Sequence, residues 1–171
     1  MRRTLFSMIV LLSIVAPRAN AELDSAAPGP LTPTMVFMFE MASGSQRIKD
    51  GILREAGSDP VLLDIFKGAL GNFDLGTLAA RLAVPLERSM PALEIAQCSR
   101  FINSPASTAL AKATNGAIEP NALISAYRSL PLEQKREVDL YFGSACGKKV
   151  AEYLNSEQAH SIGRAYGEYM V

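Results

Sequence analysis

The sequence predicts an all-α protein, a single compact bundle of about six to eight short helices. Ala, Leu, Glu, Lys, Arg and Met dominate the chain, and its apolar residues recur at the helical period of about 3.6. No long stretch alternates apolar and polar residues with period two, as a half-buried strand would. Prolines mark the expected helix starts, because the first helical turn lacks partners for its amides in any case. They occur at Thr32-Pro33, Asp59-Pro60, Glu119-Pro120 and Leu130-Pro131.

The first 21 residues predict export through a cleaved signal peptide. A basic head, Arg2-Arg3, precedes an apolar run over residues 5–16 and the small residues of Ala19-Asn20-Ala21. An uncleaved anchor is the alternative, but Pro17 and Arg18 interrupt the run before it is long enough to span a bilayer. We therefore expect residues 1–21 to be removed and the mature protein to be periplasmic, without a stable membrane anchor.

The charge balance argues against nucleic acid as a partner. The whole chain has 17 basic and 17 acidic residues, and removal of residues 1–21 takes away three arginines and no acid, which leaves a formal charge of −3. Such a chain lacks the basic surface that neutralises phosphates. A mature chain of about 150 residues can bury one core without metals or many disulfides, so we expect one domain.

Residues 22–34 are expected to form a flexible arm ahead of a single all-helical domain over residues 35–171. The arm contains three prolines, one glycine and few large apolar groups, so it buries too little surface to offset the entropy of ordering. The segment Met35–Met41 that follows is rich in Met and Phe and apolar almost all around. We expect a helix buried under the rest of the domain; an exposed one would require a partner or a lipid.

Later helices follow from apolar spacing and from a capping pattern. Two amphipathic segments carry their apolar residues at helical spacing: Val61, Leu62, Ile65, Phe66 and Leu70, then Leu75, Leu78, Ala79 and Leu82. A last helix to Met170 is expected to begin at the capping box Asn155-Ser156-Glu157-Gln158. There Asn155 would accept a bond from the backbone and Gln158 would reach back.

The region between these segments contains a candidate duplication. A shift of forty residues without gaps aligns residues 88–115 with residues 128–155, with six identities in 28 positions. Each unit has a proline-started helix, a break of small residues and a second helix, which predicts the same αα-hairpin twice. Coincidence is the alternative, because Ala-rich helical sequences align easily.

The two breaks resemble a motif of a known family. Residues 101–107 and 141–149 are similar to the aromatic-x-Ser-Pro-x-Gly-(Lys/Arg) helix break of a widespread family of small exported bacterial proteins, which is catalogued as a domain of unknown function. The similarity covers residues 86–154. Ser107 stands where the motif has glycine, and Ala145 where it has proline. The resemblance implies an exported all-helical fold and carries over no catalytic residues.

Cys98 and Cys146 are the two cysteines of the chain. In an oxidising compartment two thiols tend to form a disulfide. The repeat alignment places Cys98 on Val138 and Cys146 on Ala106, so two separate small core residues are the alternative.

The residues that could carry chemistry form no recognisable catalytic or metal-binding pattern. His160 is the only histidine, and neither cysteine has a C-x-x-C partner. Residues 143–147 lack the G-x-S-x-G spacing of a hydrolase elbow. A solvated helix face explains the charges of residues 133–139. We therefore predict no catalytic residue, no metal and no cofactor.

Tyrosines concentrate in the C-terminal part of the chain. Tyr153, Tyr166 and Tyr169 are candidates for a partner surface, because tyrosine joins an apolar ring to a polar tip. Burial in the core is the alternative for most of them.

These observations favour an exported, non-catalytic helical protein that acts by contact with another envelope protein, as an accessory or inhibitor-type module. One alternative is a carrier of small apolar ligands, with a cavity lined by Met38, Phe39 and Phe66. Another is an envelope hydrolase, which would need a cleft that joins His160 to a carboxylate or to Cys146.

Overall fold

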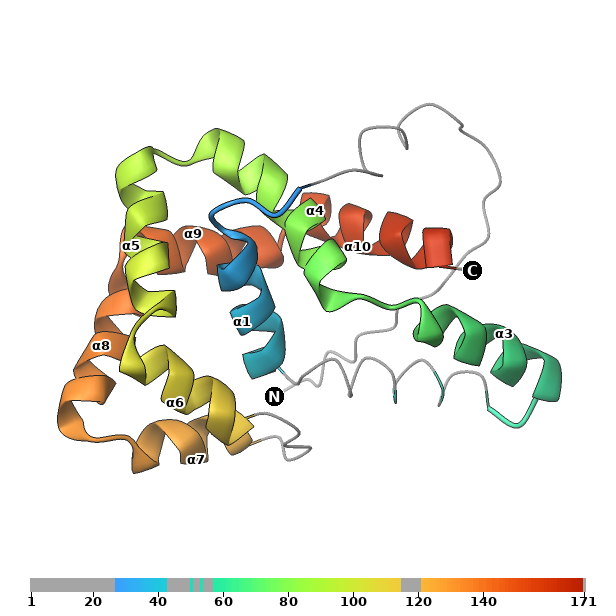
Figure 1. Cartoon of the computed structure of the whole chain (residues 1–171), viewed down its shortest axis with the longest axis horizontal. Coiled ribbons are helices and arrows are strands. Elements are labelled where there is room, and N and C mark those ends of the chain that lie inside the picture. The colour runs from blue at the N-terminus through green and yellow to red at the C-terminus, as the bar shows by residue number, and fades with distance from the viewer. Residues whose placement is uncertain (1–26, 43–49, 51–52, 54–56, 115–120, 171) are drawn as a thin grey trace, which may run out of the picture.

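The computed structural model of the chain describes residues 27–42, 50, 53, 57–114 and 121–170. These residues form nine helices and no strand, and the helices pack into one compact body, so the predicted all-α bundle is confirmed (Figure 1). Residues 1–21, the predicted signal peptide, lie outside the described part. The helices are α1 (Thr32–Ala42), α3 (Pro60–Gly71), α4 (Leu75–Ser89), α5 (Ala92–Ile102), α6 (Pro105–Thr114), α7 (Ala122–Ser129), α8 (Leu132–Gly143), α9 (Ala145–Leu154) and α10 (Glu157–Met170).

Proline and short polar residues start these helices. Pro33 lies in the first turn of α1, and Pro131 immediately precedes α8. The carboxylate of Asp59 accepts bonds from the amides of Val61 and Leu62 at the start of α3, which satisfies amides that the helix itself leaves unpaired. The predicted start at Glu119-Pro120 lies outside the described residues.

The last helix begins with a different cap from the one the sequence suggested. The Ser156 hydroxyl accepts a bond of 3.2 Å from the amide of Ala159, whereas the side-chain amide of Asn155 donates to the carbonyl of Ala151. Asn155 therefore belongs to the end of α9, and the predicted capping box is wrong by one residue. The cause is that serine and asparagine both cap helices and stand next to each other here.

The Met-rich helix α1 lies at the centre of the body, between α4 and α6 (Figure 1). Met35 is fully buried, and Phe37 and Met41 are nearly so. The ring of Phe37 meets the ring of Phe101 edge to face, with 5.5 Å between centroids. The expectation of a buried helix is confirmed: its apolar groups join the core of the surrounding helices.

The prediction of a flexible arm is wrong for residues 31–34. Leu31 and Thr34 are fully buried, and the Leu31 amide donates a bond of 2.7 Å to the Glu87 carboxylate on α4. Leu31 thus belongs to the core, and Thr32 already opens α1. The prolines, the glycine and the scarcity of large apolar groups pointed to disorder, but here Pro33 starts a helix. Residues 22–26 of the predicted arm lie outside the described part.

The two predicted αα-hairpins are present, as α5 with α6 and as α8 with α9. Their hinges are built alike: the Ser104 hydroxyl accepts a bond of 3.2 Å from the Ser107 amide, and the Ser144 hydroxyl accepts one of 3.1 Å from the Gly147 amide. Burial also repeats at a shift of forty residues over most of the two units. Shared geometry at equivalent positions supports duplication over coincidence.

An approximate local two-fold axis relates the two hairpins. Helix α5 packs on α9, and the equivalent helix α8 packs on α6 (Figure 1). Phe101 and Tyr141 are equivalent residues, and their rings stack with centroids 4.1 Å apart and planes within 10°. Reciprocal packing of α5 on α9 and of α8 on α6, together with contact between equivalent residues, is the pattern of a two-fold relation. The stacked rings therefore mark where the axis passes.

A disulfide joins Cys98 on α5 to Cys146 on α9, with 5.7 Å between their Cα atoms. It closes a loop of 48 residues, which corresponds to about 4 kcal/mol in the chain-entropy model. An ion pair between Lys149 and Glu94, 2.7 Å long, joins the same two helices. At the equivalent contact, between α8 and α6, Val138 stands in the place of Cys98 and Ala106 in the place of Cys146. Both residues are buried.

The two-fold relation predicts a second disulfide. In the double variant Ala106→Cys, Val138→Cys, the new thiols should oxidise to a bridge between α6 and α8, because their backbones repeat the geometry of α9 and α5. We expect the mass of the double variant to be lower by two hydrogens than the mass calculated with free thiols at residues 106 and 138. Its free energy of unfolding should rise by about 2 to 4 kcal/mol relative to the same variant without the new bridge. Intact-mass measurement and urea melts test this. Persistent free thiols in the folded double variant would contradict the two-fold relation.

Candidate functional site

Two of the three tyrosines proposed as a partner surface, Tyr153 and Tyr166, are buried. Tyr153 and Tyr166 are only 9% and 3% exposed, and both belong to the core. The Tyr166 hydroxyl donates to the carbonyl of Asp74 and accepts from its amide, each at 3.0 Å. Its ring lies edge-on to Phe73 and under the guanidinium of Arg81. Tyr166 therefore fastens α10 to the start of α4, and the side chain of Tyr169 lies outside the described part.

The hydroxyl groups of Tyr141 and Tyr153 are buried and have no hydrogen-bond partner among the described residues. Burial raises the pKa of Tyr153 from its ordinary value of 10.0 to about 12, and it raises the pKa of Tyr141 as well. The cause is that a phenolate loses its hydration in the core. Both residues are packing residues with an unpaired polar tip.

The described residues bring together no catalytic set. Cys146 is fully buried and oxidised to Cys98, so it offers no thiolate. His160 lies exposed on α10. The Ser144 hydroxyl donates to the Tyr141 carbonyl and accepts from the Gly147 amide, as a helix cap does. Among described residues, no group of three or more His, Cys, Asp or Glu side chains could hold a metal ion.

The charged face of α8 is solvated, as its sequence suggests. Glu133 and Glu137 are exposed, and Asp139 accepts a bond of 2.8 Å from the Tyr127 hydroxyl on α7. The Lys135 ammonium donates to the carbonyl of Arg128 at the end of α7. These contacts hold α7 against α8 and create no pair of facing carboxylates.

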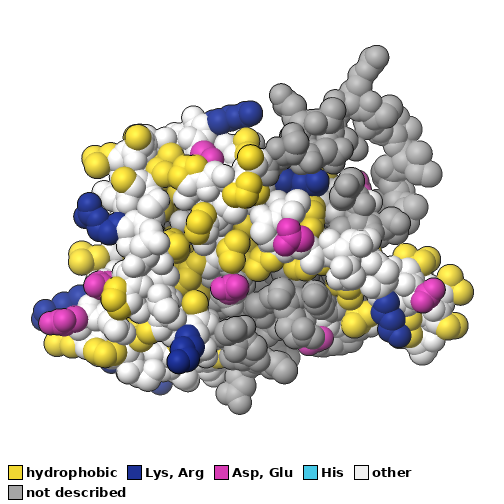
Figure 2. Space-filling model, viewed as in Figure 1, with side chains coloured by type: hydrophobic (Ala, Val, Ile, Leu, Met, Phe, Trp, Pro, Cys, Tyr) yellow, Lys and Arg dark blue, Asp and Glu magenta, His cyan; other side chains and the backbone are white. Residues whose placement is uncertain are grey.

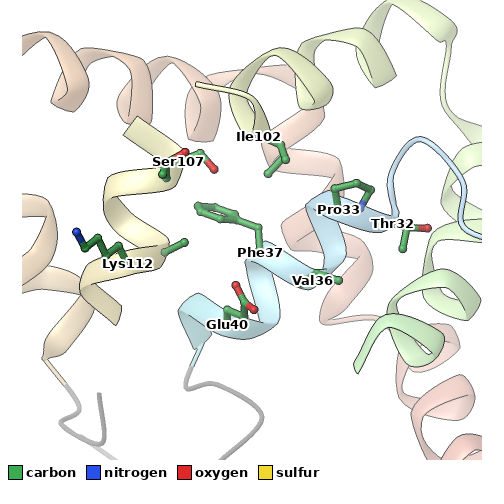
Figure 3. Close-up of a pocket in the computed structure, with 10 residues that line it drawn as sticks. Thr32, Pro33, Val36, Phe37, Glu40, Ile102, Ser107 and Lys112 are labelled. Atoms are coloured by element: carbon green, nitrogen blue, oxygen red, sulfur yellow. The ribbon is translucent and has the colours of Figure 1, made fainter. Parts of the chain in front are cut away.

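The strongest candidate site is an open groove between α1 and the α5–α6 hairpin, with a volume of about 610 Å³ (Figure 3). Helix α1 supplies one wall and α6 the other, and these two helices are in contact with each other. The ten lining residues are Thr32, Pro33, Val36, Phe37, Glu40, Ile102, Ser107, Thr108, Ala111 and Lys112.

The groove is mainly apolar, with one charge on each wall. The ring of Phe37 points from α1 toward Ser107 on α6, across the base of the groove (Figure 3). Glu40 lies on the α1 wall and Lys112 on the α6 wall. An apolar base with few polar groups at its edges is the usual composition of a binding site.

Sequence reasoning missed this groove for a topological reason. Its walls are some seventy residues apart in the chain, at Thr32–Ala42 and Pro105–Thr114. The Met-rich pattern of α1 indicated burial but not the helix that would bury it. The duplication gave no signal either, because Ile102 and Ala111 have equivalents, Phe142 and Ala151, in a hairpin that does not line the groove.

A second apolar surface lies on α3, at the edge of the molecule (Figure 1). Val61, Leu62 and Ile65 are 66%, 42% and 45% exposed, and Figure 2 shows hydrophobic side chains gathered over this helix. The buried residues of α3, Ala69 and Leu70, lie near its C-terminal end. Within the described residues, no helix is both long and apolar enough to cross a membrane.

Comparison of the chain with protein-family models, with curated proteins and with solved structures returned no match. The resemblance of the two hairpin breaks to the exported bacterial family therefore stays a prediction.

The unpaired tyrosine hydroxyls predict a specific loss of stability at high pH. Above pH 10 the unfolded tyrosines release their protons while the buried ones keep theirs, so the free energy of unfolding should fall as the pH rises from 10 toward 12. The double variant Tyr141→Phe, Tyr153→Phe should lose less stability over this range. At pH 7 it should lie within about 1 kcal/mol of the parent or be more stable, because no protein hydrogen bond is lost.

Urea melts of both proteins at pH 8, 10 and 11.5 measure this difference. An equal fall in stability for the parent and the double variant would show that other groups control the alkaline limit. A large destabilisation at pH 7 would show that the hydroxyls have partners.

Proposed function

We propose that this protein is an exported, non-catalytic helical module that binds another envelope protein through the groove between α1 and α6. The observation that carries the proposal is the groove itself, an open apolar hollow bordered by Glu40 and Lys112 on opposite walls. Exposed apolar surface with polar edges is typical of protein–protein contact sites.

The redox state of the cysteines supports the exported, non-catalytic part of this proposal. Disulfides persist in secreted and periplasmic proteins and are rare in the cytosol, and Cys98 and Cys146 are joined in the core. The same bond oxidises both cysteines of the chain and leaves no thiol nucleophile, which weighs against the hydrolase alternative. Export itself rests on the leader sequence.

The openness of the groove favours a macromolecular partner over a small ligand. Carrier sites enclose most of the surface of a small ligand, whereas this groove is largely open to solvent. Met38, Phe39 and Phe66, which a carrier cavity was expected to use, do not line it. Met38 and Phe39 instead pack against the core.

The duplication supplies matched variants for a test. Ala111 lines the groove on α6, and its equivalent Ala151 occupies the same place on α9 with a similar partial exposure. We expect Ala111→Trp to fill the groove and reduce partner binding at least tenfold, whereas Ala151→Trp should leave binding unchanged. Circular dichroism and thermal melts show whether each variant folds like the parent.

Partner capture is best measured with a photo-crosslinking amino acid in the native host. Placed at Thr108 in the groove, it should give a covalent adduct of one discrete mass; placed at the equivalent exposed residue Lys148, it should give none. The adduct should disappear in the Ala111→Trp background. Equal labelling at both positions, or an adduct that survives Ala111→Trp, would refute binding through the groove.

A further inference from the structure

We propose that the occupant of the groove is an amphipathic helix of about two turns, with a basic residue on one flank and an acidic residue on the other. This inference rests on the proposed function, because it names the class of segment that the partner would insert. It follows from the shape of the walls, from their backbone chemistry and from the two charges.

The walls have the dimensions of a helix site. The α1 residues that line the groove recur every four positions, at Thr32, Val36 and Glu40, and the α6 residues do the same, at Ser107 and Ala111. Eight residues of α1 correspond to a length of about 12 Å, which is about two helical turns. A valley between two packed helices accepts the side-chain ridge of a third helix.

Backbone chemistry excludes an extended segment as a well-fitting occupant. Both walls are α-helices, and between their first and last turns the amide and carbonyl groups already bond to each other. An extended peptide would therefore find few backbone partners in the groove, and polar groups that it buried there would stay unpaired. A helix satisfies its backbone internally and presents only side chains.

The two wall charges specify the flanks of that helix. Glu40 and Lys112 each lie two residues before the end of their helix, on opposite sides of the groove. Lys112 is favoured there by the helix dipole, but the carboxylate of Glu40 is disfavoured at a helix C-terminus. A cation from the partner would complement Glu40, and an anion would complement Lys112.

Three synthetic helical peptides of fourteen residues test this arrangement. All carry leucines at positions i, i+4 and i+7, a stripe of about two helical turns. One peptide has lysines on one flank and glutamates on the other, one has lysines on both flanks, and one has glutamates on both. The mixed peptide should bind the full chain about threefold to tenfold more tightly than either uniform peptide at low salt. The difference should vanish at about 1 M NaCl.

Charge variants of the protein should change the preferred peptide. Glu40→Lys makes both walls basic and should turn the preference to the all-glutamate peptide. Glu152→Lys is the matched control: it changes the net charge equally but lies on α9, outside the groove. Titration calorimetry or fluorescence anisotropy measures all pairs, and Ala111→Trp should abolish binding of the mixed peptide.

The outcomes separate this inference from the proposed function. Equal affinity of the three peptides, or the same shift with Glu152→Lys as with Glu40→Lys, would overturn the charge assignment. All three peptides could fail to bind while a partner is still crosslinked at Thr108 and this crosslink disappears with Ala111→Trp. That result would overturn the proposal of a helical occupant but would leave the groove as the binding site. Absence of both signals would overturn both proposals.

Discussion

The stacking of Phe101 on Tyr141 is the contact around which the rest of the structure is arranged. A single αα-hairpin has an apolar face that it cannot cover by itself. Two copies related by a two-fold axis cover each other, and the equivalent aromatic residues meet at that axis. The Cys98–Cys146 disulfide holds one of the two equivalent contacts between the hairpins, and α1 and α10 pack on the pair.

The two copies have different surroundings, and this difference creates the candidate site. Helix α1 packs on the first hairpin and places Phe37 against Phe101. On the second hairpin Phe142 approaches Tyr141 edge to face instead. At the equivalents of Thr108 and Lys112 the second hairpin carries Lys148 and Glu152. The two hairpins therefore have similar backbones, but α1 packs on the first, and the groove lies between α1 and that hairpin.

Tyrosine burial illustrates how packing decides the role of an amphipathic residue. Tyr166 pairs its hydroxyl with the backbone of Asp74 and fastens α10. The hydroxyls of Tyr141 and Tyr153 are buried in the core, where no described residue bonds to them. A phenol ring contributes enough apolar area to offset one unpaired polar atom. Their concentration near the C-terminus therefore reflects core building by α8, α9 and α10, and the binding candidate lies elsewhere.

The sequence by itself determined the helical class, the buried Met-rich helix and the duplicated hairpins, because helical spacing, proline starts and a forty-residue repeat are local or self-comparing signals. It did not determine that Leu31 joins the core, that Cys98 reaches Cys146, or that α1 lies against α6. Those contacts join segments far apart in the chain, and many side-chain partners suit each apolar face equally well. Only the tertiary arrangement selects one packing partner for each face. It also creates the groove, because the two walls, α1 and α6, are far apart in the chain and become neighbours only in the folded structure.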